Sequence, residues 1–380
     1  LNAAVYPVHK AFFEAVQDSL AKRGLNVPIR LLKPDGGNMN FNASMDYPAQ
    51  TILSGPAASV MGGIAHAPKD KTCLLMDIGG TTTDMAIMVD DVPLLAPEGI
   101  EIGTYKTSIR ALLTHSIGVG GDSAVRVAGG RLTIGPDRIG RAMAYGGPEP
   151  TPTDAFCILG MAEKGDQAKA RQGLAPIAQA LGVGVEEAAR MVFDATCEQI
   201  MVAADAMVER INSRPVYTVH EMADGLRVQP NHILILGGPA PQFAKGLQER
   251  FKGTVGVVPH WEVANAIGCA LARTTCEVSV FADTAQHMVT APGEHFSRDI
   301  AFDFDLEQAR GLAKDLLREK ARRRGANLDY LQMEIIEENR FNMIRGFRTV
   351  GRNIRVRAQV KPGLIHGFDP ESYRLVREDL

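Results

Sequence analysis

The sequence predicts an α/β fold, in which helices flank a mixed sheet, followed by a smaller α+β module at the C-terminal end. Between residues 232 and 274 two apolar strands alternate with two helices, a pattern typical of a sheet covered by helices. Upstream, strands expected at 72–77 and 83–89 flank a glycine turn, so an antiparallel pair joins the same sheet. Past Cys276 a charged helix and alternating strands replace this pattern, which indicates a separate module.

Composition limits the classes of protein to consider. The chain has 380 residues, 45% of them hydrophobic, and since single cores stop growing near ~250 to 300 residues we expect at least two lobes. With 41 Lys and Arg against 44 Asp and Glu, no general positive charge would recruit nucleic acid or an anionic membrane. The five cysteines form no C-x-x-C pair, and no apolar run of about 18 residues occurs. We therefore expect a cytoplasmic protein that binds neither nucleic acid nor membrane.

The N-terminal part contains a short series of elements. We expect a helix at 9–23, a strand at 29–32 and a helix at 57–67. Gly24 stands where a left-handed residue would end the first helix, and Ser54 opens the second. That second helix is rich in Ala and Gly, which would let another backbone approach closely. Because the chain starts Leu-Asn and enters a helix at once, we expect the natural chain to extend upstream of Leu1.

The remaining elements follow from the same periodicities. Strands are expected at 92–96, 131–134, 232–236, 255–258, 332–344 and 353–361, and helices at 154–164, 168–181, 185–211, 242–251, 262–274 and 306–324. We divide the chain into a first-lobe remnant with a connecting helix (1–70), a second lobe (71–277) and a C-terminal α+β module (278–380). The second lobe would carry a helical insertion at about 154–225.

The segment Asp77-Ile-Gly-Gly-Thr-Thr-Thr-Asp84 has the composition of a phosphate loop. Gly79 and Gly80 allow a tight turn whose backbone N–H groups converge on phosphate oxygens. Further donors would be the hydroxyls of Thr81, Thr82 and Thr83. Asp77 and Asp84 supply the hard oxygens that Mg²⁺ prefers, so we name them as metal-binding and catalytic candidates. The alternative is a plain β-hairpin with solvated aspartates.

Two further glycine-rich segments are candidates. Gly237, Gly238 and Pro239 follow an apolar strand, where open α/β sheets tend to bind ligands, so adenine and ribose would pack there; a plain strand-to-helix turn is the alternative. In the segment 118–123, Gly120 and Gly121 would cradle a ligand with successive N–H groups, or merely connect strands.

Four further polar residues lie near these segments, and their roles are either open or structural. Asp122 or Asp154 would orient a metal-bound water if the glycine-rich segment binds a ligand. His115 and Ser116 do not suggest a base and nucleophile, since neighbours on a strand point to opposite faces.

Motifs in a fixed order carry a wider resemblance. The helix Ser54-Gly-Pro-Ala-Ala-Ser-Val-Met-Gly-Gly-Ile-Ala-His66 precedes the loop, and Ile233-Leu-Ile-Leu-Gly-Gly-Pro239 and Val263-Ala-Asn-Ala-Ile-Gly-Cys-Ala-Leu271 follow it. This order resembles the superfamily of actin, heat-shock chaperones and sugar kinases. The resemblance implies an actin-like ATPase (ribonuclease H-like) lobe that binds ATP and Mg²⁺.

A closer resemblance is to the hydantoinase A and 5-oxoprolinase family. It rests on Ser54-Gly-Pro-Ala, the triple threonine, Ser116-Ile-Gly-Val-Gly-Gly-Asp-Ser123, Leu132-Thr-Ile-Gly-Pro136 and Thr151-Pro-Thr-Asp154-Ala. The resemblance implies an ATP-dependent amidohydrolase, a hydrolase that phosphorylates the carbonyl oxygen of a cyclic amide. In the related carboxylases the carbonyl belongs to a ketone. A hydantoinase B-type partner subunit is implied as well.

The sequence also departs from this family. Asp122 stands within Gly120-Gly-Asp-Ser123, where the family has Gly-Gly-Gly-Ser, and Gly140-Arg-Ala-Met-Ala-Tyr145-Gly replaces Pro-Gly-Pro-Ala-Cys-Tyr-Gly. The family's first phosphate motif, a second Asp-x-Gly-Gly-Thr, is absent from this sequence, so we expect the chain alone to hydrolyse ATP poorly. Two alternatives stay open, a nucleotide-gated binding protein and an activator ATPase. For the loop, Asp84→Ala should impair nucleotide binding, whereas Asp90→Ala should not.

Overall fold

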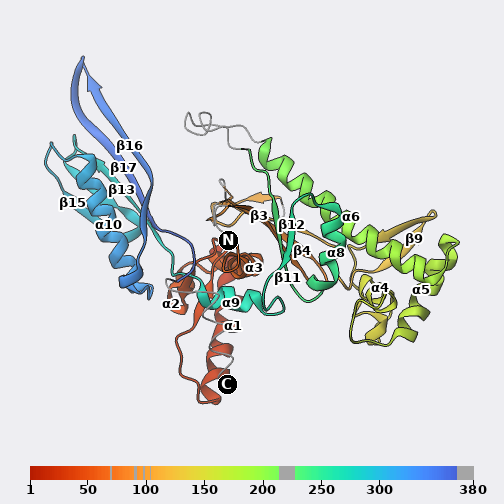
Figure 1. The fold of residues 1–380 in the computed structure, drawn as a ribbon. Coiled ribbons are helices and arrows are strands. Elements are labelled where there is room, and N and C mark those ends of the chain that lie inside the picture. Colours follow the sequence, from red (N-terminus) through yellow and green to blue (C-terminus); the bar gives the residue numbers. More distant parts are fainter. Residues whose placement is uncertain (69–70, 90–91, 97–98, 103, 214–226, 366–380) are drawn as a thin grey trace. The chain divides into compact units, whose positions relative to one another are not determined.

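The computed structural model describes residues 1–68, 71–89, 92–96, 99–102, 104–213 and 227–365 (Figure 1). Contacts divide the chain into two compact units, one formed by Leu1–Ser54 with Leu271–Leu380 and the other by Gly55–Ala270. The division at 70 and 277 that the sequence suggests stays a prediction. Its helical insertion includes 214–225, and these residues lie outside the described part, as does the Asp90-Asp91 turn.

The unit Gly55–Ala270 is built on a six-stranded sheet. Its strands are β3 (Thr72–Ile78), β4 (Thr83–Val89), β5 (Val92–Pro93), β8 (Thr114–Ile117), β11 (His232–Leu236) and β12 (Thr254–Val257). The order is β12-β11-β3-β4-β5, and β8 also pairs with β4. Since β11 runs parallel to β3 and β12 while β4 runs antiparallel to β3, the sheet is mixed, which confirms the predicted fold class.

One hydrophobic core joins this sheet to four helices, α4 (Pro152–Ile158), α5 (Gln167–Leu181), α6 (Val185–Asn212) and α8 (Ala240–Arg250). Phe156, Phe193 and Phe243, from α4, α6 and α8, meet with ring centroids 5.0 to 6.3 Å apart. Such aromatic pairs add about 0.5 to 1.5 kcal/mol each beyond their buried area. Helices that are distant in sequence are thereby fixed against one sheet.

Small residues join two further helices, α3 (Ser54–Ile64) and α9 (Ala264–Leu271). A Cβ on Gly62 would lie 2.1 Å from the carbonyl oxygen of Ala264, and one on Gly268 would lie 2.3 Å from the backbone nitrogen of Gly62. A Cβ on Gly63 would lie 1.6 Å from Leu75 of β3. The predicted close approach of another backbone to this helix is confirmed.

Several element boundaries differ from the sequence-based expectation. The helix expected at 154–164 runs from Pro152 to Ile158. It starts earlier than expected because the side chains of Thr151 and Asp154 form a capping box there. Strand β5 and helix α9 are shorter than expected. The other short elements of this unit are β6 (Glu101–Ile102), β7 (Tyr105–Lys106), β9 (Val125–Ala128), β10 (Arg131–Ile134) and η2 (Met143–Tyr145). Strands β9 and β10 form a hairpin.

The other unit contains a five-stranded antiparallel sheet with the order β15-β14-β13-β17-β16. Its elements are β13 (Glu277–Asp283), β14 (Met288–Ala291), η3 (Pro292–Glu294), β15 (Phe296–Asp299), α10 (Leu306–Arg323), η4 (Leu328–Tyr330), β16 (Met333–Arg345) and β17 (Arg348–Val360). Ala309, Ala313 and Leu317 of α10 are buried against Val280 and Val356 of the sheet. This arrangement confirms an α+β module.

The N-terminal residues of the same unit form short elements. They are α1 (Asn2–Lys22), β1 (Arg30–Leu32), β2 (Asn38–Asn40), α2 (Phe41–Asp46) and η1 (Pro48–Thr51). Helix α1 begins seven residues before the expected start and includes Pro7. Its buried residue is His9, whose Nε2 lies 2.8 Å from Ser44 Oγ of α2. None of the described helices of the chain is both long and apolar enough to cross a bilayer.

Candidate functional site

The candidate site lies where β3 and β11 end. These strands are parallel neighbours, with Leu236 opposite Asp77, so the turns that follow them share one edge of the sheet. Gly237 has a φ of +95°, and a Cβ there would lie 2.6 Å from Asp77 Oδ1 and 2.3 Å from the carbonyl oxygen of Ile78. Glycine is therefore required for this turn to pack against Asp77.

Asp77 and Asp84 lie directly opposite each other on the antiparallel strands β3 and β4. Residues in that position share a face of the sheet, so the two carboxylates project to the same side. Ser59 of α3 donates a hydrogen bond to Asp77 Oδ2, and Ser116, opposite Asp84 on β8, forms a hydrogen bond with that carboxylate. Neither Ser59 nor Ser116 was identified from the sequence as a support for these carboxylates.

Burial raises the pKa of both carboxyl groups above the ordinary aspartate value. For Asp77 the hydrogen bond from Ser59 opposes this shift, and the negative charge of Asp84 adds to it. For Asp84 the hydrogen bond with Ser116 opposes it. Keeping both partly buried carboxylates ionised costs free energy, because their like charges repel each other, and a cation between them would remove that cost.

The glycine turn, residues 79–82, closes with a hydrogen bond from Gly79 N–H to the carbonyl oxygen of Thr82 at 2.9 Å. Within the described residues, the N–H groups of Gly80, Thr81 and Thr82 donate to no acceptor. Three successive N–H groups at the tip of a turn can bind an anion. Thr83 is a correction to the predicted donors, because its hydroxyl is fully buried and donates to the carbonyl of Val119 at 2.7 Å.

The second glycine-rich segment, residues 118–123, packs against this turn. The N–H groups of its two central glycines are not free to bind a ligand. Gly120 N–H donates to Ser123 Oγ at 2.8 Å and Gly121 N–H to the carbonyl oxygen of Gly79 at 2.9 Å. Both donors are engaged, which corrects the role expected for Gly120 and Gly121. A Cβ on Gly121 would also lie 3.3 Å from Pro239 Cγ, so the predicted adenosine segment lies beside this loop.

Arg138 is a site residue that the sequence did not identify. Its guanidinium donates to Thr81 Oγ1 at 2.8 Å and to Asp122 Oδ2 at 2.7 Å. The same Asp122 oxygen lies 2.7 Å from the position of a Cβ on Gly80. Burial raises the pKa of Asp122, and the charge of Arg138 opposes that shift. Arg138 therefore holds a carboxylate and a loop hydroxyl together beside the glycine turn.

Asp154 does not reach this site. It is fully buried and accepts hydrogen bonds from the backbone N–H groups of Met143, Ala144 and Thr151, at 2.7 to 3.1 Å. Asp154 therefore has a structural role, which corrects the prediction that it could orient a metal-bound water.

Replacing Asp154 by Ala is expected to lower the free energy of unfolding by about 3 kcal/mol, since it leaves several buried N–H donors without an acceptor. Urea unfolding would measure the change, with Asp205→Asn on the exposed face of α6 as the control. A loss of ligand binding at unchanged stability would contradict the structural role.

Among the described residues, no group of three or more His, Cys, Asp or Glu side chains could hold a metal ion. The pair Asp77 and Asp84 is nevertheless suited to Mg²⁺, which usually takes one or two protein carboxylates and completes its shell with water and phosphate oxygens. A Cβ on Gly238 would meet no atom within 4 Å, so that side of the site is open. The geometry thus combines free N–H donors, two carboxylates and an open strand end.

Comparison with known proteins gives the family. The family model of hydantoinase/oxoprolinase matches residues 1–278. The chain belongs to the hydantoinase/oxoprolinase family. The gamma subunit of acetophenone carboxylase from Aromatoleum aromaticum is 27% identical over 325 residues, which are 78% of this chain and 41% of that protein.

Two solved structures show the fold of this hydantoinase/oxoprolinase chain. The nucleotide-free structure of acetone carboxylase has a TM-score of 0.63 at 18% identity, covering 92% of this chain and 54% of that one. The ATP-dependent caprolactamase of Pseudomonas jessenii has a TM-score of 0.59 at 17% identity, covering 96% and 57%. The chain therefore has an actin-like ATPase fold and spans about half the length of the relatives it matches.

Proposed function

We propose that the chain is the part of an ATP-dependent enzyme that binds ATP and Mg²⁺ at the end of β3. The N–H groups of Gly80, Thr81 and Thr82 would receive phosphate oxygens, and Asp77 and Asp84 would hold Mg²⁺, partly through water. Gly238 and Pro239 would border the adenosine. The observation that carries this proposal is the direct cross-strand pairing of Asp77 and Asp84 beside three N–H groups that have no acceptor among the described residues.

The proposed reaction is carbonyl activation. The γ-phosphoryl group would move to the carbonyl oxygen of a cyclic amide or ketone, with ADP as the leaving group. In a cyclic amide, water would then attack the activated carbon, and phosphate would leave with the former carbonyl oxygen. In a ketone, loss of an α proton would give an enol phosphate whose carbon attacks CO₂, and water would then release the phosphoryl group as phosphate. Mg²⁺ would neutralise charge on the phosphates. Family membership supports this chemistry, and so do the similarities to an acetone carboxylase and an ATP-dependent caprolactamase, both of which act on carbonyl compounds.

Assembly with further protein is part of the proposal. The chain spans 41% of the acetophenone carboxylase gamma subunit, and that relative is itself one subunit of an enzyme. We therefore assign turnover to a larger assembly that includes a hydantoinase B-type partner, and nucleotide binding to this chain. A cytoplasmic location is consistent with its five free cysteines.

Calorimetric titration of the chain with ATP tests the nucleotide site. We expect saturable binding with Mg²⁺ present and much weaker binding with excess chelator, because the carboxylates would otherwise face the phosphates without a cation. Binding that is equal in both conditions, or absent in both, would rule out this site. The carbonyl step has a separate test, the transfer of ¹⁸O from a labelled cyclic amide to phosphate by the full assembly.

The affinity for MgATP should fall as the pH is lowered. Only the ionised carboxylates attract Mg²⁺, and burial raises the pKa of both Asp77 and Asp84, so the loss should begin above the pH range in which ordinary aspartates titrate. Titrations at successively lower pH, from neutral pH to the range in which ordinary aspartates titrate, would measure it. A constant affinity across this range would show that the two carboxylates do not hold the metal.

A further inference from the structure

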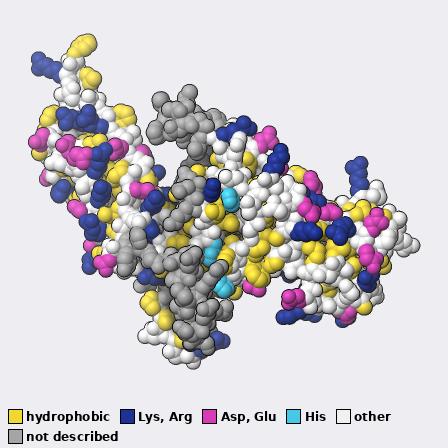
Figure 2. Space-filling view, in the orientation of Figure 1, with side chains coloured by type: hydrophobic (Ala, Val, Ile, Leu, Met, Phe, Trp, Pro, Cys, Tyr) yellow, Lys and Arg dark blue, Asp and Glu magenta, His cyan; other side chains and the backbone are white. Residues whose placement is uncertain are grey.

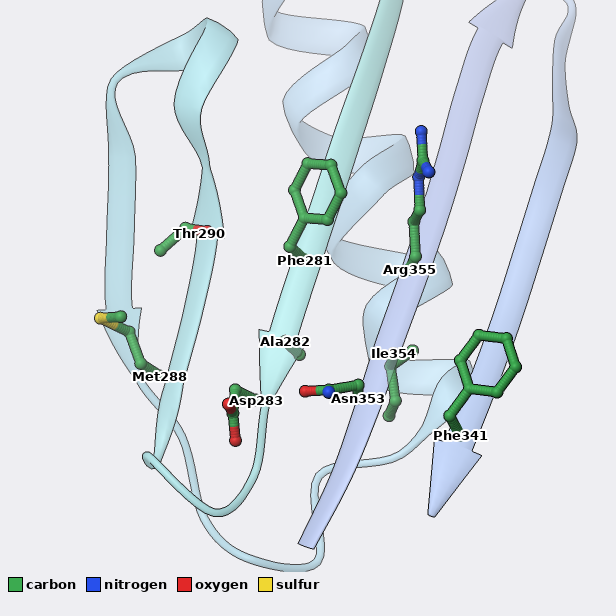
Figure 3. A pocket seen from close by; sticks show the side chains of 9 residues that line it. All are labelled: Phe281, Ala282, Asp283, Met288, Thr290, Phe341, Asn353, Ile354 and Arg355. Atoms are coloured by element: carbon green, nitrogen blue, oxygen red, sulfur yellow. The ribbon is translucent and has the colours of Figure 1, made fainter. Parts of the chain in front are cut away.

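Among the described residues, α10 covers one face of the five-stranded sheet of the C-terminal module, and the other face, here called the open face, carries exposed side chains. Phe281 of β13 and Phe341 of β16 project from the open face and are 39% and 65% exposed. Between them lies a pocket of about 180 Å³, which Met288 and Asn353 also line (Figure 3). A cavity of about 150 Å³ can hold benzene, so this pocket can accept one aromatic or branched aliphatic side chain.

A basic hairpin arm, residues 339–352, adjoins this pocket. Strand β13 pairs with β17 only from Asn353 onward, so the arm extends past the sheet (Figure 1). It contains four arginines, Arg340, Arg345, Arg348 and Arg352, and no Asp or Glu. Phe347 at its turn is fully exposed and Ile344 is 70% exposed. Dark blue and yellow side chains accordingly cover the end of the hairpin in Figure 2.

The arginines of the arm differ from those of the sheet in their acidic neighbours. On the sheet, Arg355 and Arg357 both lie near Glu337, with N···O distances of 3.3 and 3.7 Å, and Arg355 also lies over the ring of Phe281 at 5.3 Å. Within the described residues, the four arginines of the arm form no ion pair. An uncompensated positive charge thus stands next to an exposed apolar pocket, a combination that marks an interaction surface.

We propose that the open sheet face and the arm together dock a separate protein with an acidic surface, which inserts one apolar side chain into the pocket. The positive charge of the arm favours an acidic partner, and the pocket fixes the position at which that partner binds. A second copy of this chain fits poorly, because a two-fold contact would bring two basic arms together. Duplex nucleic acid would leave the apolar pocket unused, and Asp283 at its edge would repel phosphates.

Charge dependence can be tested with the full chain and a defined probe, a fluorescein-labelled decapeptide of Asp and Glu with one central Phe. Fluorescence anisotropy should show saturable binding that weakens with salt. The double variant Arg345→Glu/Arg348→Glu should weaken it at least ~10-fold, which is about 1.4 kcal/mol. Lys314→Glu reverses an exposed charge on α10, which covers the opposite face, and should leave binding unchanged.

The pocket is tested by replacing the peptide's Phe with Ala. The wild-type chain should prefer the Phe peptide, and Phe341→Ala, a change at an exposed position, should remove the preference. No saturable binding at millimolar peptide, or equal losses in the arm variant and Lys314→Glu, would overturn the proposal. It would also be overturned if duplex DNA or phosphatidylserine vesicles bound more tightly with the same dependence on the arm.

Discussion

Asp77→Asn is expected to weaken Mg²⁺-dependent ATP binding roughly 10- to 100-fold, the range seen when a group that orients a bound metal is lost. The Asn side chain has nearly the same shape, and its amide oxygen can still accept the hydrogen bond from Ser59. The negative charge is lost, and with it the attraction for Mg²⁺ next to Asp84. Calorimetry with and without Mg²⁺ would measure the effect.

The same variant should be more stable than the wild type in the absence of ligand. Because the folded-state pKa of Asp77 is raised, the folded protein binds this proton more tightly than the unfolded chain does. The stability from that proton is present at low pH and lost as the pH rises through the raised pKa. Asn imitates the uncharged form, so the melting temperature at neutral pH should rise by a few degrees.

Asp205→Asn is the matched control for Asp77→Asn, since Asp205 is exposed on α6. It should change neither affinity nor melting temperature. A variant of Asp77 that loses binding and stability together would show that Asp77 supports the fold without holding metal. Asp84→Asn should reproduce the loss of affinity, because the two carboxylates share one ion.

Arg138→Ala is expected to lower the affinity for MgATP at least ~10-fold, or about 1.4 kcal/mol. The guanidinium neutralises Asp122 and fixes the hydroxyl of Thr81. Without it, a carboxylate beside Gly80 would repel the phosphates that the turn binds. Arg138→Lys should lower the affinity for MgATP less than Arg138→Ala does. An ammonium keeps the positive charge but cannot form the same two hydrogen bonds, to Asp122 and Thr81, at once.

A double-mutant cycle separates this role from simple loss of a cation. Asp122→Asn in the Arg138→Ala background should recover most of the affinity, with a coupling energy of about 0.5 to 3 kcal/mol. Arg131→Ala, at an exposed position of β10, is the control and should have no effect. Additive losses in the cycle would mean that Arg138 acts on the nucleotide independently of Asp122.

The parts of the site that lie within one strand–turn–strand unit could be predicted from the sequence. Asp77 and Asp84 flank a short glycine turn, so the hairpin register alone places them opposite each other. The family resemblance was equally accessible, since its motifs are continuous, and the family match over 1–278 confirms it. The fold class followed from the alternation of strands and helices in the same way.

Contacts between segments distant in sequence could not be predicted. Whether the N–H group of Gly121 is free depends on which turn packs against it, and its acceptor, Gly79, lies about 40 residues upstream. Arg138 follows the β9–β10 hairpin, and no spacing in the sequence relates it to Thr81. Asp154 was a candidate for orienting a metal-bound water because the sequence does not reveal which groups donate hydrogen bonds to a carboxylate.

The sequence by itself determined the α/β class, the family, and the pair of carboxylates on either side of a glycine turn. These features depend on local periodicity and on residues that are neighbours along the chain. Only the tertiary structure decided which N–H groups remain free, that Ser59 and Ser116 support the carboxylates, and that Arg138 holds Asp122. Such pairings arise when the helices and hairpins pack around the sheet, and packing is not encoded in any single segment.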